Sequence, residues 1–514
     1  MLKSSGAMGA ATVLSRLLGL MRELVYAAFM GTSSVAGAFA VAFTIPNLFR
    51  RLLGEGALTA AFIPIFKEKE RTAGDAEMWR AANAVISGLI VSAAGIIAVV
   101  LLGITAALAW GAFTGYTRLM LELLRIMFPY MLLVCLAATF MGILNARGHF
   151  FIPSLGAALL NVVMIASVFW IAPRMGKTLD RQIFGLAIGV LLAGLAQAAF
   201  QIPALRREGY RYRWVSPWRD PTVREVIRKM LPASVGVAAF QINVLFTQLL
   251  AFGVHEPIVA AFNYAVRLME FPQGVFGISL ATYLLPTLSS LAADKHYDEF
   301  RSTLRQGLGY LLFVNLFASV FLVILAEPII RLLFERREFG SSSTSEVSVA
   351  LACLAPGLVA FSSVNILARA FYALGDTKTP MHISVFCLGV NLFFAILLVQ
   401  PYRAAGLGLA NTVTSFLNLG LLWYSLRRKL GRLELGELKQ SLMAIMPAAL
   451  FAGLLGWSLS FLWESHLGHE SLMLKFGSVF GPMLPAATVY WLIALWVGVP
   501  AARDVANLLV RKPK

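Results

Sequence analysis

Apolar runs of about twenty residues, one after another, constrain this sequence more than any other feature. This is the length that an α-helix needs to cross a bilayer core of ~30 Å. Only 13% of the 514 residues are charged and 59% are hydrophobic, with a mean hydropathy of +0.77. A soluble protein of this size could not cover its surface with so few charges. The sequence therefore predicts an all-α, multi-pass membrane protein.

We predict about fourteen membrane-spanning helices, and the short connections between them leave no room for a further soluble domain. The predicted spans are 7–30, 34–65, 82–111, 119–144, 152–172, 183–204, 226–253, 257–290, 306–330, 347–373, 379–399, 404–426, 441–463 and 477–499. If the N-terminus is cytoplasmic, 27 of the 43 Lys and Arg fall in cytoplasmic segments and 9 in the opposite loops. The positive-inside rule accounts for this bias. We therefore predict that both termini are cytoplasmic, and we attribute the net charge of +17 to membrane orientation rather than to nucleic acid binding.

A weak internal repeat, with an offset near 225 residues, divides the chain in two. Ala146 and Pro153 at one turn match Ala373 and Pro380 at another, although chance similarity among apolar helices is an alternative. Two repeated halves with a substrate site between them are a common transporter plan. We predict an N-lobe of six spans over 1–205, a basic cytoplasmic linker over 206–229, a C-lobe of six spans over 230–430, and the last two spans with a cytoplasmic tail over 431–514.

Arginines inside the predicted spans are the most informative residues. An Arg at the middle of a membrane helix costs ~2.5–3.5 kcal/mol on insertion scales, so it normally faces a hydrated cavity or a partner. The candidates are Arg16, Arg22, Arg50, Arg51, Arg125, Arg267 and Arg369. Snorkelling or pairing between helices is enough to explain Arg125 and Arg369.

The first span carries two of these arginines. Arg16 and Arg22 lie six residues apart, which separates them by ~9 Å along a helix and by about 120° around it. They can therefore line one cavity at two depths. The alternative for Arg16 is that it snorkels to the head groups.

The second span contains a helix break at mid-depth. Pro46 and Asn47 precede Arg50 and Arg51, and a broken span is tolerated only where it is buried in protein or lines a cavity. Glu55 lies four residues after Arg51 and can pair with it, which would leave Arg50 as the freer charge. The alternative is that both arginines are held in ion pairs.

The eighth span, the repeat mate of the second, carries Arg267 and Glu270, followed by Pro272. Arg267 and Glu270 can pair locally, and a purely structural pair is the alternative. Several arginines around one cavity suit a phosphate or diphosphate, which the guanidinium group binds through forked hydrogen bonds. Since the carboxylates are fewer, we expect a net positive cavity.

Known catalytic and metal-binding patterns are missing from the sequence. The six histidines are scattered, and Cys135, Cys353 and Cys387 lie in apolar runs without ligand spacing. We predict no catalytic residue, no metal ligand and no cofactor. An intramembrane enzyme assembled from distant residues remains an alternative.

Several motifs resemble one transporter family. They are Ser15-Arg16-Leu17-Leu18-Gly19 with Arg22, Phe43-Thr44-Ile45-Pro46-Asn47-Leu48-Phe49-Arg50-Arg51, Glu55-Gly56-Ala57, Leu144-Asn145-Ala146 with Pro153 and Asn161, and Arg267-Leu268-Met269-Glu270-Phe271-Pro272. Up to about residue 430 the chain resembles the MurJ (MviN) family of the multidrug/oligosaccharidyl-lipid/polysaccharide exporter superfamily. Beyond that point only the hydropathy matches.

The resemblance implies two six-helix lobes around a cationic central cavity, plus two C-terminal helices that form a groove for a lipid tail. It implies a flippase, not an enzyme, that moves lipid II across the bacterial inner membrane by alternating access. Lipid II, membrane lipids and cell-wall synthesis proteins would be its partners. By motif, the substrate-binding residues are Arg16, Arg22, Arg50 and Arg267, and the supporting cavity or hinge residues are Arg51, Glu55, Glu270, Pro46, Asn47 and Pro272.

The sequence also departs from the family pattern. Gly37 stands where many members carry an Asp, and Thr247 stands where some members carry a sodium-binding Asp. These departures argue against a sodium site of the family type and leave coupling to the membrane potential or to another ion open. Other readings are a flippase for lipid-linked polysaccharide repeats, a cation-coupled drug exporter and a membrane scaffold for cell-wall enzymes.

Overall fold

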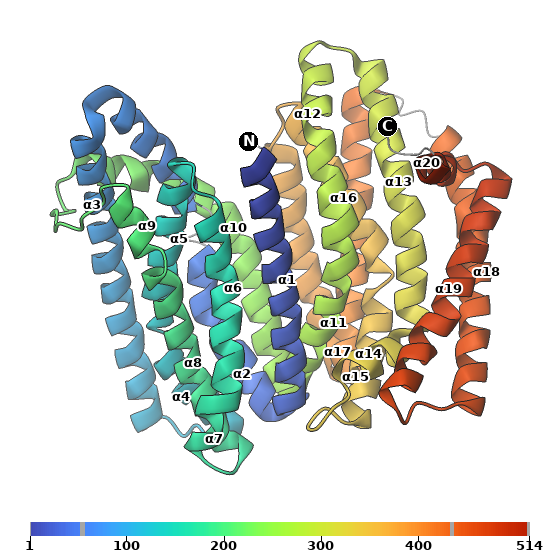
Figure 1. Ribbon diagram of the computed structural model, residues 1–514, viewed down its shortest axis with the longest axis horizontal. Helices are drawn as coiled ribbons and strands as arrows, with labels where there is room; N and C mark the ends of the chain where they lie inside the picture. Colours follow the sequence, from blue (N-terminus) through green and yellow to red (C-terminus); the bar gives the residue numbers. More distant parts are fainter. Residues whose placement is uncertain (1, 52–56, 432–435, 511–514) are drawn as a thin grey trace. The chain divides into compact units, whose positions relative to one another are not determined.

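The structure is a computed structural model that describes residues 2–51, 57–431 and 436–510. Within these ranges the chain forms α-helices, short π-helical segments and turns, without strands (Figure 1). The all-α prediction is therefore confirmed. The chain divides into two compact units, Met1–Ala260 and Ala261–Lys514.

The first unit contains the helices of the N-terminal half. They are α1 (Leu2–Met30), α2 (Ser34–Phe49), α3 (Ala57–Trp110), α4 (Gly115–Met127), α5 (Tyr130–Ala146), α6 (Phe151–Ala166), η2 (Ser167–Ile171), α7 (Ala172–Met175), α8 (Leu179–Ala199), α9 (Ile202–Arg207) and α10 (Pro221–Val254).

The second unit contains the helices of the C-terminal half, except for the first turn of α11. They are α11 (Pro257–Pro272), η3 (Gln273–Ile278), α12 (Ser279–Ala293), α13 (Tyr297–Ile324), α14 (Ala326–Phe334), α15 (Ser341–Leu354), α16 (Gly357–Ala373), α17 (Lys378–Leu430), α18 (Gly436–His466), α19 (Leu472–Val497) and α20 (Pro500–Val510). The sequence did not predict α20, which follows the last span.

Among the described residues, eight helices are long and apolar enough to cross a membrane, or ten if each bent pair is one span. Two of them are too long for a single crossing. The 53 residues of α17 would extend about 80 Å as one straight helix, but the left-handed backbone of Arg403 (φ 49°) breaks them. Gly74 (φ 78°) breaks α3 in the same way. Several membrane crossings are thus confirmed, and the count of fourteen stays a prediction.

Two predicted spans are bent rather than straight. α4 and α5 meet at 44°, and α15 and α16 meet at 45°. Proline explains both bends, because Pro129 and Pro356 stand at the breaks and cannot donate the helix hydrogen bond. These prolines are 227 residues apart, and α5 and α16 each have 17 residues. The two bends therefore agree with the offset of the predicted repeat.

The compact units and the predicted lobes divide the chain at different places. α10 packs against α3 and α2 within the first unit, whereas the prediction assigned residues from 230 onward to the C-lobe. The lobes were predicted from the repeat, whereas the compact units are defined by packing. The lobe boundaries therefore stay a prediction.

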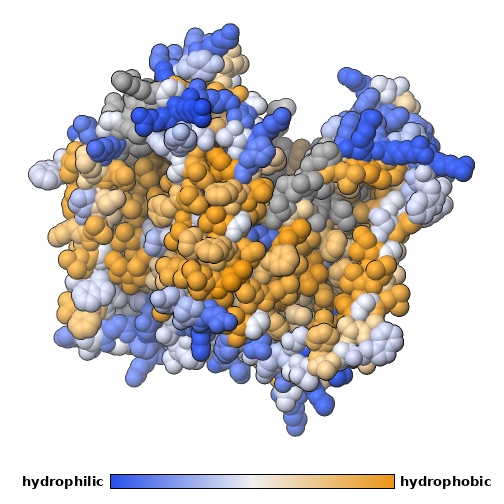
Figure 2. All heavy atoms as spheres, turned by 180° about the vertical axis from the view of Figure 1, so that it is seen from behind, coloured by the Kyte–Doolittle hydropathy of each residue, from blue (hydrophilic) through white to orange (hydrophobic). Residues whose placement is uncertain are grey.

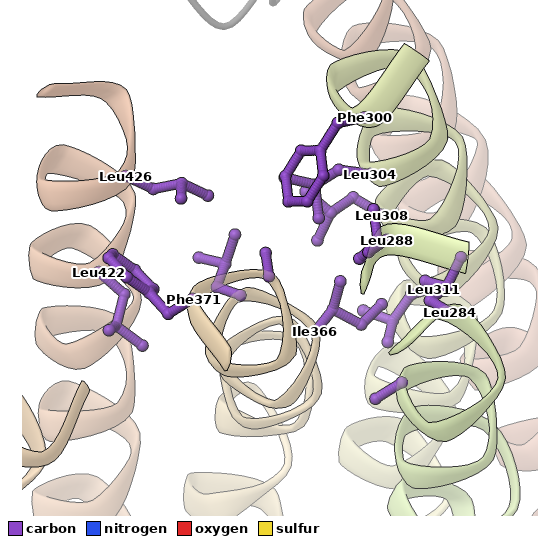
Figure 3. Close-up of a cluster of buried hydrophobic side chains, with 13 residues drawn as sticks. Leu284, Leu288, Phe300, Leu304, Leu308, Leu311, Ile366, Phe371, Leu422 and Leu426 are labelled. Atoms are coloured by element: carbon purple, nitrogen blue, oxygen red, sulfur yellow. The ribbon is translucent and has the colours of Figure 1, made fainter. Parts of the chain in front are cut away.

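Apolar packing holds each unit together. In the second unit, leucines and phenylalanines of α12, α13, α16 and α17 form one buried cluster (Figure 3). α18, α19 and α20 pack on α13, where the Tyr490 hydroxyl donates to the Phe313 carbonyl at 2.7 Å. Figure 2 shows hydrophobic side chains in a band around the middle of the helices, with hydrophilic side chains at their ends. This distribution is typical of a protein surrounded by lipid.

Candidate functional site

A polar contact within the first unit joins α1 and α6, which lie side by side (Figure 1). Asn161 of α6 is buried, and its amide nitrogen donates to the Ala157 carbonyl at 3.2 Å and to the Ser15 carbonyl of α1 at 3.3 Å. A Cβ at Gly19 would lie 3.7 Å from that nitrogen, an ordinary van der Waals distance, so α1 passes close to the Asn161 amide at this point. Asn161 is therefore a fixed acceptor next to the middle of α1.

Arg22 uses that acceptor. Its side chain is 16% exposed; Nη1 donates to Asn161 Oδ1 at 3.0 Å and Nη2 to Glu23 Oε1 at 2.6 Å. The guanidinium carbon lies 5.6 Å from the ring centre of Tyr26, within cation–π range. Arg22 is thus held in one orientation by two helices.

Two buried polar atoms of this cluster have no hydrogen-bond partner among the described residues. They are Arg22 Nε and Tyr26 Oη. Buried polar groups nearly always have a partner, so an unpaired donor signals a water or ligand position. The cluster can therefore accept one more hydrogen-bonding group.

Arg16, the other predicted arginine of α1, is in a different setting. Its side chain is exposed, and it makes no hydrogen bond or ion pair with another described residue. Arg16 and Arg22 are not brought into contact with each other.

The end of α2 has the predicted break. Pro46 is buried within the helix, and at Arg50 the backbone widens into a π-helical turn. Arg50 Nε donates to Asn47 Oδ1 at 2.7 Å, and Arg51 Nη1 lies 3.5 Å from Gln241 Oε1 of α10. Glu55 lies outside the described residues, and so does its predicted pairing with Arg51.

Arg267 of α11 pairs on its own helix. Its Nη1 lies 2.8 Å from Glu270 Oε2, and the two side chains are 48% and 50% exposed. Pro272 ends α11, and the π-helical segment η3 follows it. The structure thus brings together Arg267 with Glu270, Arg50 with Asn47, and Arg22 with Glu23. Their convergence on one cavity stays a prediction.

Sequence reasoning assigned no role to Asn161 or Tyr26. An asparagine inside an apolar helix was the available signal, since a buried amide needs partners. The choice between a bond within α6 and a bond to α1 depends on which helices pack together. Tyr26 lies four residues after Arg22, a spacing that places the two on one helix face.

Packing explains one departure from the family pattern. A Cβ at Gly37 would lie 2.1 Å from the Glu256 carbonyl oxygen, so an aspartate there would force α2 away from the loop before α11. Thr247 of α10 is buried, and its hydroxyl has no partner among the described residues. No group of three or more His, Cys, Asp or Glu within the described ranges could hold a metal ion.

Two polar turns outside the membrane helices are separated by the offset of the predicted repeat. After α5, Arg147 Nε donates to Glu208 Oε2 at 2.9 Å, and its Nη1 bonds to Glu70. His149 Nε2 lies 2.7 Å from Glu208 Oε1. Hydrogen bonds from His149 and Arg147 hold the pKa of Glu208 below its usual range.

The corresponding turn after α16 has the opposite charge. Asp376 accepts from Lys429 Nζ at 2.7 Å and from the backbone nitrogen and hydroxyl of Thr379 at 3.0 and 2.8 Å. These bonds, first of all that from Lys429, lower the pKa of Asp376 to about 2.

Known proteins of one family are similar to this chain in sequence. The family model described as "Lipid II flippase MurJ" matches residues 26–477. The "Probable lipid II flippase MurJ" of Vibrio cholerae is 36% identical over 439 residues, covering 83% of each chain. The "Lipid II flippase MurJ" of Burkholderia cenocepacia is 33% identical over 467 residues, covering 88% of this chain and 89% of the relative.

Solved structures agree in fold. A structure titled "Lipid II flippase MurJ, inward closed conformation" superposes with a TM-score of 0.77 at 22% identity, covering 97% of this chain and 99% of that one. An inward-facing multidrug resistance MATE transporter of the MOP superfamily gives a TM-score of 0.65 at 17% identity, covering 84% of this chain and 99% of that one. The family model and these relatives span most of the chain, and the chain therefore belongs to the MurJ family of lipid II flippases, transporters of the MOP superfamily fold rather than enzymes.

Proposed function

We propose that this protein flips lipid II from the cytoplasmic to the periplasmic leaflet of the bacterial inner membrane by alternating access. The observation that carries the proposal is the family match over residues 26–477. At residue level, Arg22 supports it: a partly buried guanidinium, fixed by Asn161, still has an unpaired Nε donor. A diphosphate oxygen is a suitable acceptor for that donor.

In this proposal Arg22, Arg50 and Arg267 contact the diphosphate, and Arg16 lies nearer the entrance. Two of these guanidinium groups are held by asparagines before substrate arrives. Asn161 of α6 holds Arg22, and Asn47 of α2 holds Arg50. Pre-oriented donors lose less side-chain entropy when they bind. Pro46 and Pro272 would act as hinges at the ends of α2 and α11.

The test is lipid II translocation by purified protein in proteoliposomes. We expect the triple variant R22A/R50A/R267A to lose translocation, because the head group loses its charge-assisted hydrogen bonds. The double variant R125A/R369A is the matched control, since it removes two other arginines of the predicted spans. Equal activity of the triple variant and the control would refute the assignment of these residues.

The same assay separates the rival substrates. The MATE fold similarity favours a drug exporter as the second candidate. Transport of a cationic dye without lipid II transport would favour that exporter. Transport of another undecaprenyl-diphosphate glycan in place of lipid II would favour a polysaccharide-repeat flippase.

For the energy source, we propose that the membrane potential resets the empty, positively charged site. Moving one charge through 100 mV is worth ~2.3 kcal/mol. An imposed potential, negative on the cytoplasmic side, should accelerate translocation, whereas a sodium gradient at zero potential should not.

For the orientation of the chain in the membrane, we propose that both termini lie in the cytoplasm. The accessibility of terminal tags in intact cells tests this orientation.

A further inference from the structure

A segment between α9 and α10 carries alternating arginines and aromatic residues. We call residues 206–220 the basic strap. Its sequence includes Arg211-Tyr212-Arg213-Trp214, and then Trp218-Arg219. In Figure 1 the strap is the green coil beside α3.

Hydrogen bonds fix the strap on α3. Asn83 Nδ2 donates to the Arg211 carbonyl at 3.0 Å, and the Tyr212 hydroxyl lies 3.2 Å from Ser87 Oγ. At the far end, Arg80 Nη1 lies 3.0 Å from Asp220 Oδ2, and this carboxylate also caps α10. The strap is therefore tied to α3 at three places, once through its backbone and twice through its side chains.

The inner face of the strap is packed. Tyr210 is buried and its ring lies 5.5 Å from that of Trp79. Pro217 is buried too, and its Cβ would lie 3.3 Å from a Cβ added at Gly88. Under this cover, every residue of α3 from 81 to 87 is buried.

These contacts give the position of the strap relative to lipid. The charged part of α3 ends at Arg80, and the apolar run begins at Ala81. Ser87 lies about 10 Å further along the helix axis. The strap thus lies across the boundary between the polar and apolar parts of α3, where tryptophan and arginine side chains are favoured in membrane proteins.

The outer face of the strap is exposed. Trp214 is 58% exposed and Trp218 is 71% exposed. The guanidinium groups of Arg211, Arg213 and Arg219 are exposed as well, and no ion pair or hydrogen bond joins them to another part of the chain that the structure describes. These exposed arginines lie between aromatic residues typical of a membrane interface, and an anion could bind them from outside.

We propose that the basic strap binds the head groups of anionic phospholipids, with Arg211, Arg213 and Arg219 contacting phosphates and Trp214 and Trp218 lying among the glycerol and upper acyl groups. The charge of the strap selects the lipid, and its aromatic residues set its depth. This site lies entirely in the first unit and is separate from Arg22.

Titration of the detergent-purified full-length chain with phosphatidylglycerol or phosphatidylcholine, with bound lipids counted by native mass spectrometry, tests the proposal. Each basic residue near an anionic surface is worth about 1 kcal/mol, which is roughly a fivefold change in affinity. We expect R211Q/R213Q/R219Q to lose most of the preference for phosphatidylglycerol, on the order of 100-fold. W214A/W218A should weaken the binding of both lipids alike.

Two matched variants make the result decisive. R211K/R213K/R219K keeps the charge and should keep the preference. R174Q/K177Q/R181Q removes three cations near α7 and α8 and should also keep it. The proposal is overturned if wild type shows no preference for phosphatidylglycerol, if the glutamine triple variant binds it like wild type, or if the lysine variant loses as much as the glutamine variant.

Discussion

The two units hold their predicted substrate-binding arginines in different ways. In the first unit, Arg22 is 16% exposed and bonded across a helix pair to Asn161. In the second unit, Arg267 is 48% exposed and bonded to Glu270 on its own helix. A partner on another helix fixes both the position and the direction of a guanidinium group, whereas an (i, i+3) pair on an exposed face is weak. Two arginines that are predicted to bind the same substrate thus need not be held with the same rigidity.

The polar turns of the two units show the opposite relation. Arg147 and His149 are tied to Glu208 in the first unit, and Asp376 is tied to Lys429 in the second. Both tethers connect corresponding turns to the end of a later helix, with the charges exchanged. The turn carries the positive charge in the first unit and the negative charge in the second. An ion pair stabilises the contact in both cases, whichever side is positive.

The largest expected effect is the difference between the Arg22→Ala and Arg267→Ala variants. Arg22→Ala should lower lipid II translocation about 10- to 100-fold, since it removes a charge-assisted hydrogen bond worth ~1.5–3 kcal/mol. It should also lower the thermal stability, because the bonds from Arg22 to Asn161 and to Glu23 are both lost. Arg267→Ala should lower translocation less, and should leave the unfolding temperature within a degree or two. Equal loss of stability in both variants would contradict the difference in rigidity.

The next effect tests the cross-helix partner. Asn161→Ala removes the acceptor for Arg22, and we expect a destabilisation of ~1–3 kcal/mol together with a lower translocation rate. Asn365→Ala is the matched control, because within the described ranges its amide bonds only to the Phe361 carbonyl of its own helix. Thermal unfolding and translocation should both separate the two variants. Equal behaviour would show that the α1–α6 contact does not position Arg22.

A smaller effect concerns the turns. Asp376→Ala should cost ~1–2 kcal/mol of stability, because it removes both the acceptor for the Thr379 N–H at the start of α17 and the pair with Lys429. The reversed pair D376K/K429D should recover only the ionic part, ~0.2–1 kcal/mol in a double-mutant cycle. Full recovery would mean that the cap contributes nothing.

The smallest effect is the pH dependence of the Asp376 tether. Its pKa is lowered in the folded state to about 2 from an ordinary value of 3.8, so its contribution is complete above pH ~4 and is lost as the pH falls toward 2. At pH 4 the loss should be only about 0.3 kcal/mol. Unfolding of wild type and Asp376→Asn between pH 7 and 3 measures it, and their difference should shrink only at the acidic end.

Much of the fold could be predicted from local sequence. Apolar runs predicted the helices, and the equal lengths of α5 and α16 were not predicted. The bends at Pro129 and Pro356 were missed, because hydropathy does not distinguish a kinked span from a straight one. The division of α17 was anticipated, because its break at Arg403 falls between the predicted spans 379–399 and 404–426.

The candidate site could be predicted only in part. Arg22, Arg50 and Arg267 stand out because charge is rare at membrane depth. The partners Asn161 and Gln241 lie 139 and 190 residues away from the arginines they contact, beyond the reach of any local pattern.

The sequence by itself determined that this chain is an α-helical membrane protein of the MurJ family with arginines inside its spans, because hydropathy, charge and motifs are properties of neighbouring residues. Only the tertiary structure decided that Asn161 fixes Arg22, that a glycine is required where α2 meets the Glu256 carbonyl, and that the basic strap lies on α3 with its cations outward. The physical reason is that hydrogen bonds and steric exclusion act over a few ångströms in space, whatever the separation along the chain.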